Sequence, residues 1–178
     1  MMVHELRAPL TAVRCSSESL VKNLTTAQGV DQAKVKDTMV TIETASNNML
    51  ELVNDLLDVA KIEAGKFELN IQDYDLVDVI NQQAKVLRPQ AELKHLAINV
   101  TTPPKYVMKF DRIRIGQVLG NLISNAIKYT DSGQIEINLN ANAEENKIIV
   151  SVKDSGIGVS HEDLAQLFSK FKQLNSGD

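Results

Sequence analysis

The sequence predicts two parts, an antiparallel helical hairpin followed by an α/β sandwich with helices on one face of a mixed or antiparallel sheet. Two narrow apolar stripes, stepping by three and four residues, occupy the first part. After Gly65 the period changes, and alternating runs and helical stripes succeed each other in the order β, α, β, β, α, β, β, α. We place the hairpin at 1–65 and the second domain at 66–178.

The two hairpin stripes each follow one face of a helix. Apolar or small residues recur from Val3 to Leu24 and again from Ile42 to Val59, with a break at 25–31 between them. A two-helix hairpin has almost no interior, so neither stripe is covered within one chain. We therefore expect two copies to pair into a dimeric four-helix bundle.

The second part opens with a change to period two. Residues 67–71 alternate between apolar and polar side chains and predict a strand. Asp75 is placed to cap a helix that ends near Leu93, although Pro89 is a second candidate for its end. This is the first helix that we expect to cover the sheet.

A second helix of the sandwich follows two short predicted strands, at 97–100 and 107–110. Asp111 caps this helix. Its apolar positions step by three and four and are Ile115, Val118, Leu119, Leu122, Ile123, Ala126 and Ile127.

The last predicted elements are a hairpin and a short helix. Two alternating runs, 135–139 and 148–152, flank a polar turn at 142–146 and predict an antiparallel pair of strands. Ser160 with Asp163 then opens a final short helix.

Composition excludes several classes of protein. The formal net charge is −4 and the charges are interleaved, so there is no basic face for a nucleic acid. One cysteine, Cys15, rules out an intramolecular disulfide and a Cys-based zinc cluster and suits a reducing compartment. No apolar run approaches the roughly 20 residues that span a bilayer, so we expect this stretch to be cytoplasmic and without membrane contact.

The first chemical motif is the run HELRAP at residues 4–9, in which His4 is a candidate functional residue. Inside a helix, Pro9 removes a backbone hydrogen bond and clashes with the carbonyl of Glu5, which costs about 3 kcal/mol. It therefore predicts a bend one turn beyond His4. The alternative is that the helix begins at Pro9.

The second motif lies on the helix that Asp111 caps. Asn121, Asn125 and Lys128 fall at i, i+4 and i+7, on one face of that helix. Amide oxygens suit Mg²⁺, and a lysine beside them suits the phosphates that accompany the metal. A solvated polar helix face is the alternative interpretation.

The third motif, DSGIG at residues 154–158, directly follows a predicted strand. Gly156 and Gly158 permit positive φ and a close approach of the backbone to a ligand, while Asp154 presents a carboxylate acceptor at the strand end. A simple chain reversal is the alternative.

In their order and spacing, these motifs resemble the H box, N box and G1 box of the histidine kinase family, and LFSKF at 167–171 resembles its F box. The resemblance covers essentially the whole chain and implies that the second domain is a Bergerat-type ATP-binding domain. It implies a two-component sensor histidine kinase that uses ATP and Mg²⁺. Such a kinase phosphorylates His4 as a homodimer and passes the phosphoryl group to an aspartate of a response regulator receiver domain.

The resemblance also assigns roles at the phosphoryl end of the reaction. His4 accepts the γ-phosphoryl group on a ring nitrogen, and Glu5 helps to orient and deprotonate the imidazole. Asn121 and Asn125 serve Mg²⁺, and Lys128 meets phosphate.

The remaining implied ATP-binding residues surround the base. Tyr129 borders the adenine, and Asp154 accepts a hydrogen bond from its amino group. Gly156 and Gly158 shape the pocket. His95 and His161 lie outside every motif, and we expect them to face solvent.

Two features depart from the family pattern. The family usually carries Thr or Asn four residues after the phosphoacceptor, where it serves dephosphorylation of the partner; here that residue is Ala8, which has no hydrogen-bonding group. The sequence also ends at Asp178, before a glycine-rich G2 box. We therefore expect an incomplete ATP lid and weak or no ATP binding by this stretch alone. A longer protein with a membrane anchor stays compatible with the pattern.

Two other classes of function stay open. One is a different GHKL ATPase of the chaperone, gyrase or mismatch-repair type, in which a glutamate base stands where this chain has Asn121. An amide cannot accept a proton from water at neutral pH, so phosphotransfer is favoured over ATP hydrolysis. The other is a non-catalytic dimeric scaffold or degenerate kinase that docks a response regulator.

Overall fold

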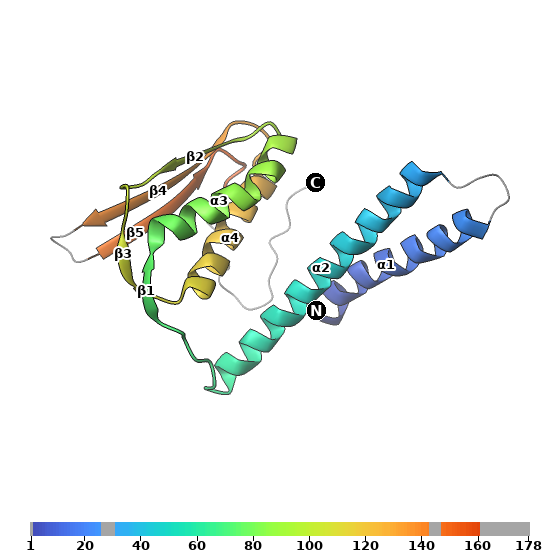
Figure 1. Ribbon diagram of the computed structural model, residues 1–178, viewed down its shortest axis with the longest axis horizontal. Coiled ribbons are helices and arrows are strands. Elements are labelled where there is room, and N and C mark those ends of the chain that lie inside the picture. Colours follow the sequence, from blue (N-terminus) through green and yellow to red (C-terminus); the bar gives the residue numbers. More distant parts are fainter. Residues whose placement is uncertain (1, 26–30, 143–146, 161–178) are drawn as a thin grey trace. The chain divides into compact units, whose positions relative to one another are not determined.

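A computed structural model describes residues 2–25, 31–142 and 147–160 of the chain (Figure 1). The chain divides into two compact units, and it passes from the first to the second between Glu68 and Leu69. Within the described ranges, none of the helices combines the length and apolar character needed to cross a bilayer. Three predicted features lie outside the described residues. They are His161, the 167–171 motif and the short helix that was expected to begin at Ser160.

The first unit is a pair of long helices, α1 (Met2–Thr25) and α2 (Gln32–Glu63). Helix α1 runs through Pro9, so the alternative start at Pro9 is excluded. Asp31 caps α2, and its Oδ1 accepts hydrogen bonds from the amides of Ala33 and Lys34 at 3.0 and 3.2 Å. The two helices contact each other.

Helix α2 ends at the glycine that the sequence predicted. Gly65 has φ +65°, and its amide donates to the carbonyl of Ile62 at 3.0 Å. The amide of Lys66 donates to the carbonyl of Lys61 at 2.9 Å, which completes a Schellman motif.

In its described residues, the second unit is a layer of two helices on five strands. The elements are β1 (Gln72–Asp75), α3 (Leu76–Leu93), β2 (Ala97–Thr101), β3 (Val107–Phe110), α4 (Arg112–Tyr129), β4 (Gln134–Asn142) and β5 (Lys147–Asp154). Helices α3 and α4 contact each other and lie on one face of the strands (Figure 1). Strands β1 and β3 pair antiparallel, β2 pairs parallel with β4, and β4 pairs antiparallel with β5, so the predicted hairpin is present and the larger sheet is mixed.

One continuous core joins these layers. Its largest fully buried side chains are isoleucines, namely Ile80 of α3, Ile123 of α4, and Ile135 and Ile137 of β4. Burying each such side chain contributes roughly 1.5–3 kcal/mol. This core holds the C-terminal ends of α4 and β5 in place, and those ends carry the predicted site.

The strand predicted at 67–71 is wrong. Those residues form no strand, and β1 begins at Gln72, where it finds a partner in Phe110 of β3. Leu69 and Ile71 are more than half exposed, because there is no neighbouring strand to cover them. Alternation alone does not make a strand when the hydrogen-bonding partner is missing.

Helix α3 continues through Pro89 and ends after Leu93. The amide of His95 donates to the carbonyl of Glu92, and the amide of Leu96 donates to the carbonyl of Ala91, both at 2.9 Å. This is again a Schellman motif, with His95 at φ +57° in the position that usually holds glycine. His95 is exposed, as predicted.

Asp111 fixes the start of α4. Its Oδ1 accepts from the amides of Ile113 and Arg114, each at 3.0 Å, and its Oδ2 accepts from the amide of Asn70 at 2.8 Å. The hydrogen bond from Arg114, followed by that from Asn70, holds the pKa of Asp111 below its ordinary value. One carboxylate thus caps the helix and anchors the chain that enters β1.

We predict that Asp111→Asn lowers the free energy of unfolding at neutral pH. The depressed pKa means that the ionised carboxylate stabilises the fold above pH about 4 and that this contribution is lost as pH falls further. The difference between wild type and variant, measured by urea unfolding from pH 7 to pH 3, should therefore shrink below pH about 4. A difference that does not change with pH would contradict the role of the charge.

Candidate functional site

The predicted polar face of α4 is exposed. Asn121, Asn125 and Lys128 all lie on the side of the helix that faces away from the sheet. The opposite side, with Leu119 and Ile123, is buried in the core. The core therefore fixes the rotation of α4, and this rotation leaves two amides and an ammonium group accessible on one face.

Two of the apolar positions of α4 also lie on this exposed face. Val118 and Leu122 are 54% and 46% exposed. They extend the apolar stripe of the helix beyond the side that is buried in the core. The exposed face of α4 thus carries polar and apolar side chains next to each other.

The C-terminal end of α4 is hydrogen-bonded to the loop that follows β5. The amide of Ile157 donates to the carbonyl of Tyr129 at 3.2 Å. The C-terminal end of the second motif is therefore in contact with the loop of the third motif, although about 25 residues separate them in the sequence. Tyr129 itself is 39% exposed.

Steric contacts require a glycine at position 156, where the loop after β5 meets the end of α4. A Cβ atom at Gly156 would lie 2.3 Å from the carbonyl oxygen of Tyr129 and 2.8 Å from Oδ1 of Asp154. The same Oδ1 accepts a hydrogen bond from the amide of Gly156 at 2.9 Å. Gly158 has φ +70° and open space around it, so its glycine is required by the backbone conformation alone.

Ser155 is a residue of the site that sequence reasoning missed. Its hydroxyl donates to the carbonyl of Ser132 at 3.0 Å and accepts from the amide of Gln134 at 3.1 Å. It lies so close to Gly133 that a Cβ atom there would be 2.2 Å from the Ser155 oxygen. Ser155 thus connects the loop after α4 with the loop after β5 through hydrogen bonds. In the sequence, the one indication of this close contact is Gly133, the glycine directly before β4.

Lys128 and Tyr129 contact each other. The Lys128 ammonium lies 4.9 Å from the centre of the Tyr129 ring, a cation–π contact between neighbours on the helix. Both side chains border the exposed end of α4, where the resemblance places phosphate and adenine.

His4 and Glu5 belong to the first unit. Both lie in the first turns of α1, and their side chains are outside the described part of the structure. Ala8, one turn further along α1, is exposed. The candidate phosphoacceptor and the candidate nucleotide site are therefore on different units of the chain.

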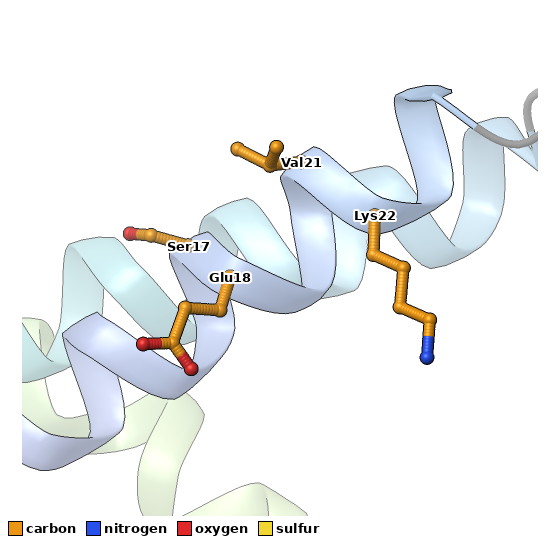
Figure 2. A pocket seen from close by; sticks show the side chains of 4 residues that line it. All are labelled: Ser17, Glu18, Val21 and Lys22. Carbon is orange, nitrogen blue, oxygen red and sulfur yellow. The ribbon is translucent and has the colours of Figure 1, made fainter.

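A shallow groove of about 500 Å³ lies on α1. In this groove, Ser17 and Val21 lie on one side of the helix, and Glu18 and Lys22 extend from the neighbouring side (Figure 2). All four residues come from two turns of α1, so this groove contains none of the predicted nucleotide-site residues.

The donor set of the site fits a metal that arrives with a nucleotide. Across the described ranges, no three His, Cys, Asp or Glu side chains gather into a metal-binding cluster. Asn121 and Asn125 offer amide oxygens one helical turn apart, and Mg²⁺ commonly takes one or two protein oxygens together with phosphate and water. These residues would hold the metal only in combination with a triphosphate.

Comparison with known proteins identifies both units. Residues 1–65 match the His Kinase A (phospho-acceptor) domain family, and residues 110–178 match the histidine kinase-, DNA gyrase B- and HSP90-like ATPase family. The "Non-motile and phage-resistance protein" of Caulobacter vibrioides is 36% identical over 98% of this chain, and hybrid signal transduction histidine kinase B of Dictyostelium discoideum is 34% identical over the same share. The chain spans only 21% and 9% of the length of these two proteins.

Solved structures agree with these relatives. The Acinetobacter baumannii histidine kinase AdeS is similar over 93% of this chain and 78% of its own, with a TM-score of 0.71 and 26% identity. The histidine kinase ThkA, solved in complex with the response regulator protein TrrA, is similar over 96% of this chain and 48% of its own, with a TM-score of 0.62 and 25% identity. Fold and motifs define a phospho-acceptor hairpin joined to an ATPase-type domain. The chain belongs to the sensor histidine kinase family.

We predict that Gly156→Ala destabilises the second unit by about 1–3 kcal/mol, because the added methyl group meets backbone that cannot move away. Gly120→Ala is the matched control, since a Cβ there meets only the Gln83 side chain at 3.2 Å and alanine favours a helix. Urea unfolding should show a loss for the first variant and none for the second. Equal stability of the two variants would contradict the tight junction.

Proposed function

We propose that this chain is the catalytic core of a two-component sensor histidine kinase. It would phosphorylate His4 with ATP and pass the phosphoryl group to an aspartate of a response regulator receiver domain. The observation that carries the proposal is the junction of the exposed Asn121–Tyr129 face of α4 with the Asp154–Gly158 loop, in a chain whose first unit matches a phospho-acceptor domain. The structure of ThkA with TrrA supports the choice of a response regulator as partner.

The chemical step needs positioning and charge neutralisation more than covalent assistance. A lone pair of the neutral His4 ring forms the N–P bond while the bond from the γ-phosphorus to the bridging oxygen breaks. ADP leaves with that electron pair, and Glu5 takes the ring proton. In the second step the receiver aspartate attacks the phosphorus, the N–P bond breaks, and the proton returns to the ring.

The nucleotide side is supplied by the second unit. Asn121 and Asn125 would bind Mg²⁺ through their amide oxygens, and the metal, when bound, would supply positive charge to neutralise the phosphates. Lys128 would leave the Tyr129 ring to meet a phosphate. Asp154 keeps one oxygen bound to the Gly156 amide, so the other is left to accept from the adenine amino group.

A homodimer is part of the proposal, because α2 carries a second apolar stripe. Leu50, Val53 and Leu57 are 61%, 38% and 52% exposed. Each follows by one position a residue of the stripe that faces α1, so it is turned about 100° around the helix. Val21, on the groove side of α1, is exposed in the same way (Figure 2). A second copy would cover both stripes in a four-helix bundle.

We predict that Leu50→Glu converts the dimer to a monomer, because a charge in an apolar seam cannot be solvated. Asn48→Glu is the control, since Asn48 is exposed and lies about 200° around the helix from Leu50. Light scattering at tens of micromolar, on the order of usual assay concentrations, should report a monomer only for the first variant. A monomeric wild type would contradict the dimer.

For the kinase reaction we predict opposite defects from two substitutions in the protein that contains this chain. His4→Gln should abolish phosphorylation and leave Mg-ATP affinity unchanged, because the nucleophile and the nucleotide site are on different units. Asn125→Ala should weaken Mg-ATP binding about tenfold or more through loss of a metal-facing oxygen. Radiolabel transfer and calorimetry measure the two effects.

One outcome would contradict the assignment of His4 as the phosphoacceptor. If His4→Gln still acquired an acid-labile phosphoryl group from ATP, the phosphoacceptor would be another residue.

A further inference from the structure

Lys94, which no motif includes, binds the C-terminal end of α4. It is the residue directly after α3, and its ammonium donates to the carbonyls of Ile127 at 3.0 Å, Lys128 at 2.9 Å and Thr130 at 3.3 Å. One side chain thus makes three charge-assisted hydrogen bonds to residues more than 30 positions away in the sequence.

These hydrogen bonds satisfy backbone carbonyls at the C-terminal end of α4. The last carbonyls of a helix have no intrahelical partner, and they carry the negative end of the helix dipole. Thr130 is completely buried, so its carbonyl cannot be solvated. The remaining carbonyl in the run, that of Tyr129, accepts from the amide of Ile157. Lys94 and the loop after β5 together satisfy all four carbonyls from 127 to 130.

The position of Lys94 is itself fixed. The amide of Lys94 donates to the carbonyl of Ala91 at 3.0 Å, and the left-handed His95 follows it in the Schellman motif. Buried Ala91 and Leu96 on either side anchor this turn in the core. The ammonium is therefore held by the end of one helix against the end of the other.

We propose that Lys94 is a positioning residue of the nucleotide site. By holding the carbonyls of the last turn of α4, it sets the turn from which Lys128 and Tyr129 extend and presents the Tyr129 carbonyl to Ile157. This inference rests on the proposed function for its ligand, Mg-ATP, but its structural half can be measured without nucleotide. Lys94 acts through these neighbours and does not contact the substrate.

The test compares three variants of the protein that contains this chain. Lys94→Met removes the charge and the donors at similar length, and Lys94→Arg keeps both. Lys85→Met changes an exposed lysine within α3, the helix that Lys94 follows. Amide exchange at Ile157 reports the contact with Tyr129, and amide exchange at Ile137 in the buried strand reports the core. Calorimetry with Mg-ATP reports the site.

For Lys94→Met we expect Ile157 exchange to accelerate about tenfold or more while Ile137 exchange changes less, and Mg-ATP affinity to fall roughly threefold to tenfold. Lys94→Arg should recover most of both effects, and Lys85→Met should show neither. Unchanged Ile157 exchange in Lys94→Met, or equal acceleration at Ile137, would overturn the proposal. If the protein that contains this chain did not bind Mg-ATP, the proposed function would instead be refuted, and Ile157 exchange would still decide the role of Lys94.

Discussion

The arrangement of the second unit depends on how the exposed end of α4 satisfies its backbone carbonyls. A helix that ends at a functional surface leaves carbonyls without partners. Here Lys94 supplies donors from the end of α3, and the Ile157 amide supplies one from the loop after β5. The same contacts bring together three segments far apart in sequence. The geometry of the candidate site is thus a consequence of capping one helix.

The two units differ in what stabilises them. In the second unit, the buried residues of α3, α4 and the sheet form one core. In the hairpin, Ala45 is the one buried hydrophobic side chain among the described residues. A hairpin of this kind gains stability chiefly by pairing with another surface, whereas the second unit has an apolar interior of its own. This difference suits a kinase in which the phosphoacceptor and the nucleotide are carried separately.

Much of the fold was predictable because local chemistry determines it. Asp75 and Asp111 cap the helices that the sequence assigned to them, and Gly65 ends α2. The strand at 67–71 was mispredicted, since a strand depends on the neighbour that pairs with it. Three residues at the candidate site received no role from the sequence: Lys94 and Gly133 belong to none of the three motifs, and Ser155 lies within the 154–158 motif without an assigned contact. Their partners lie more than 20 residues away, so only the folded chain reveals them.

The proposed Mg-ATP site lies where α4 meets the loop after β5. A titration of the isotopically labelled chain with Mg-ATP, monitored by the chemical shifts of its backbone amides, tests this location. We expect the largest shifts within Asn121–Thr130 and Asp154–Gly158, with little change in α1 and α2. Largest shifts at the Ser17–Lys22 groove, or an even spread over the second unit, would show that the nucleotide does not bind there.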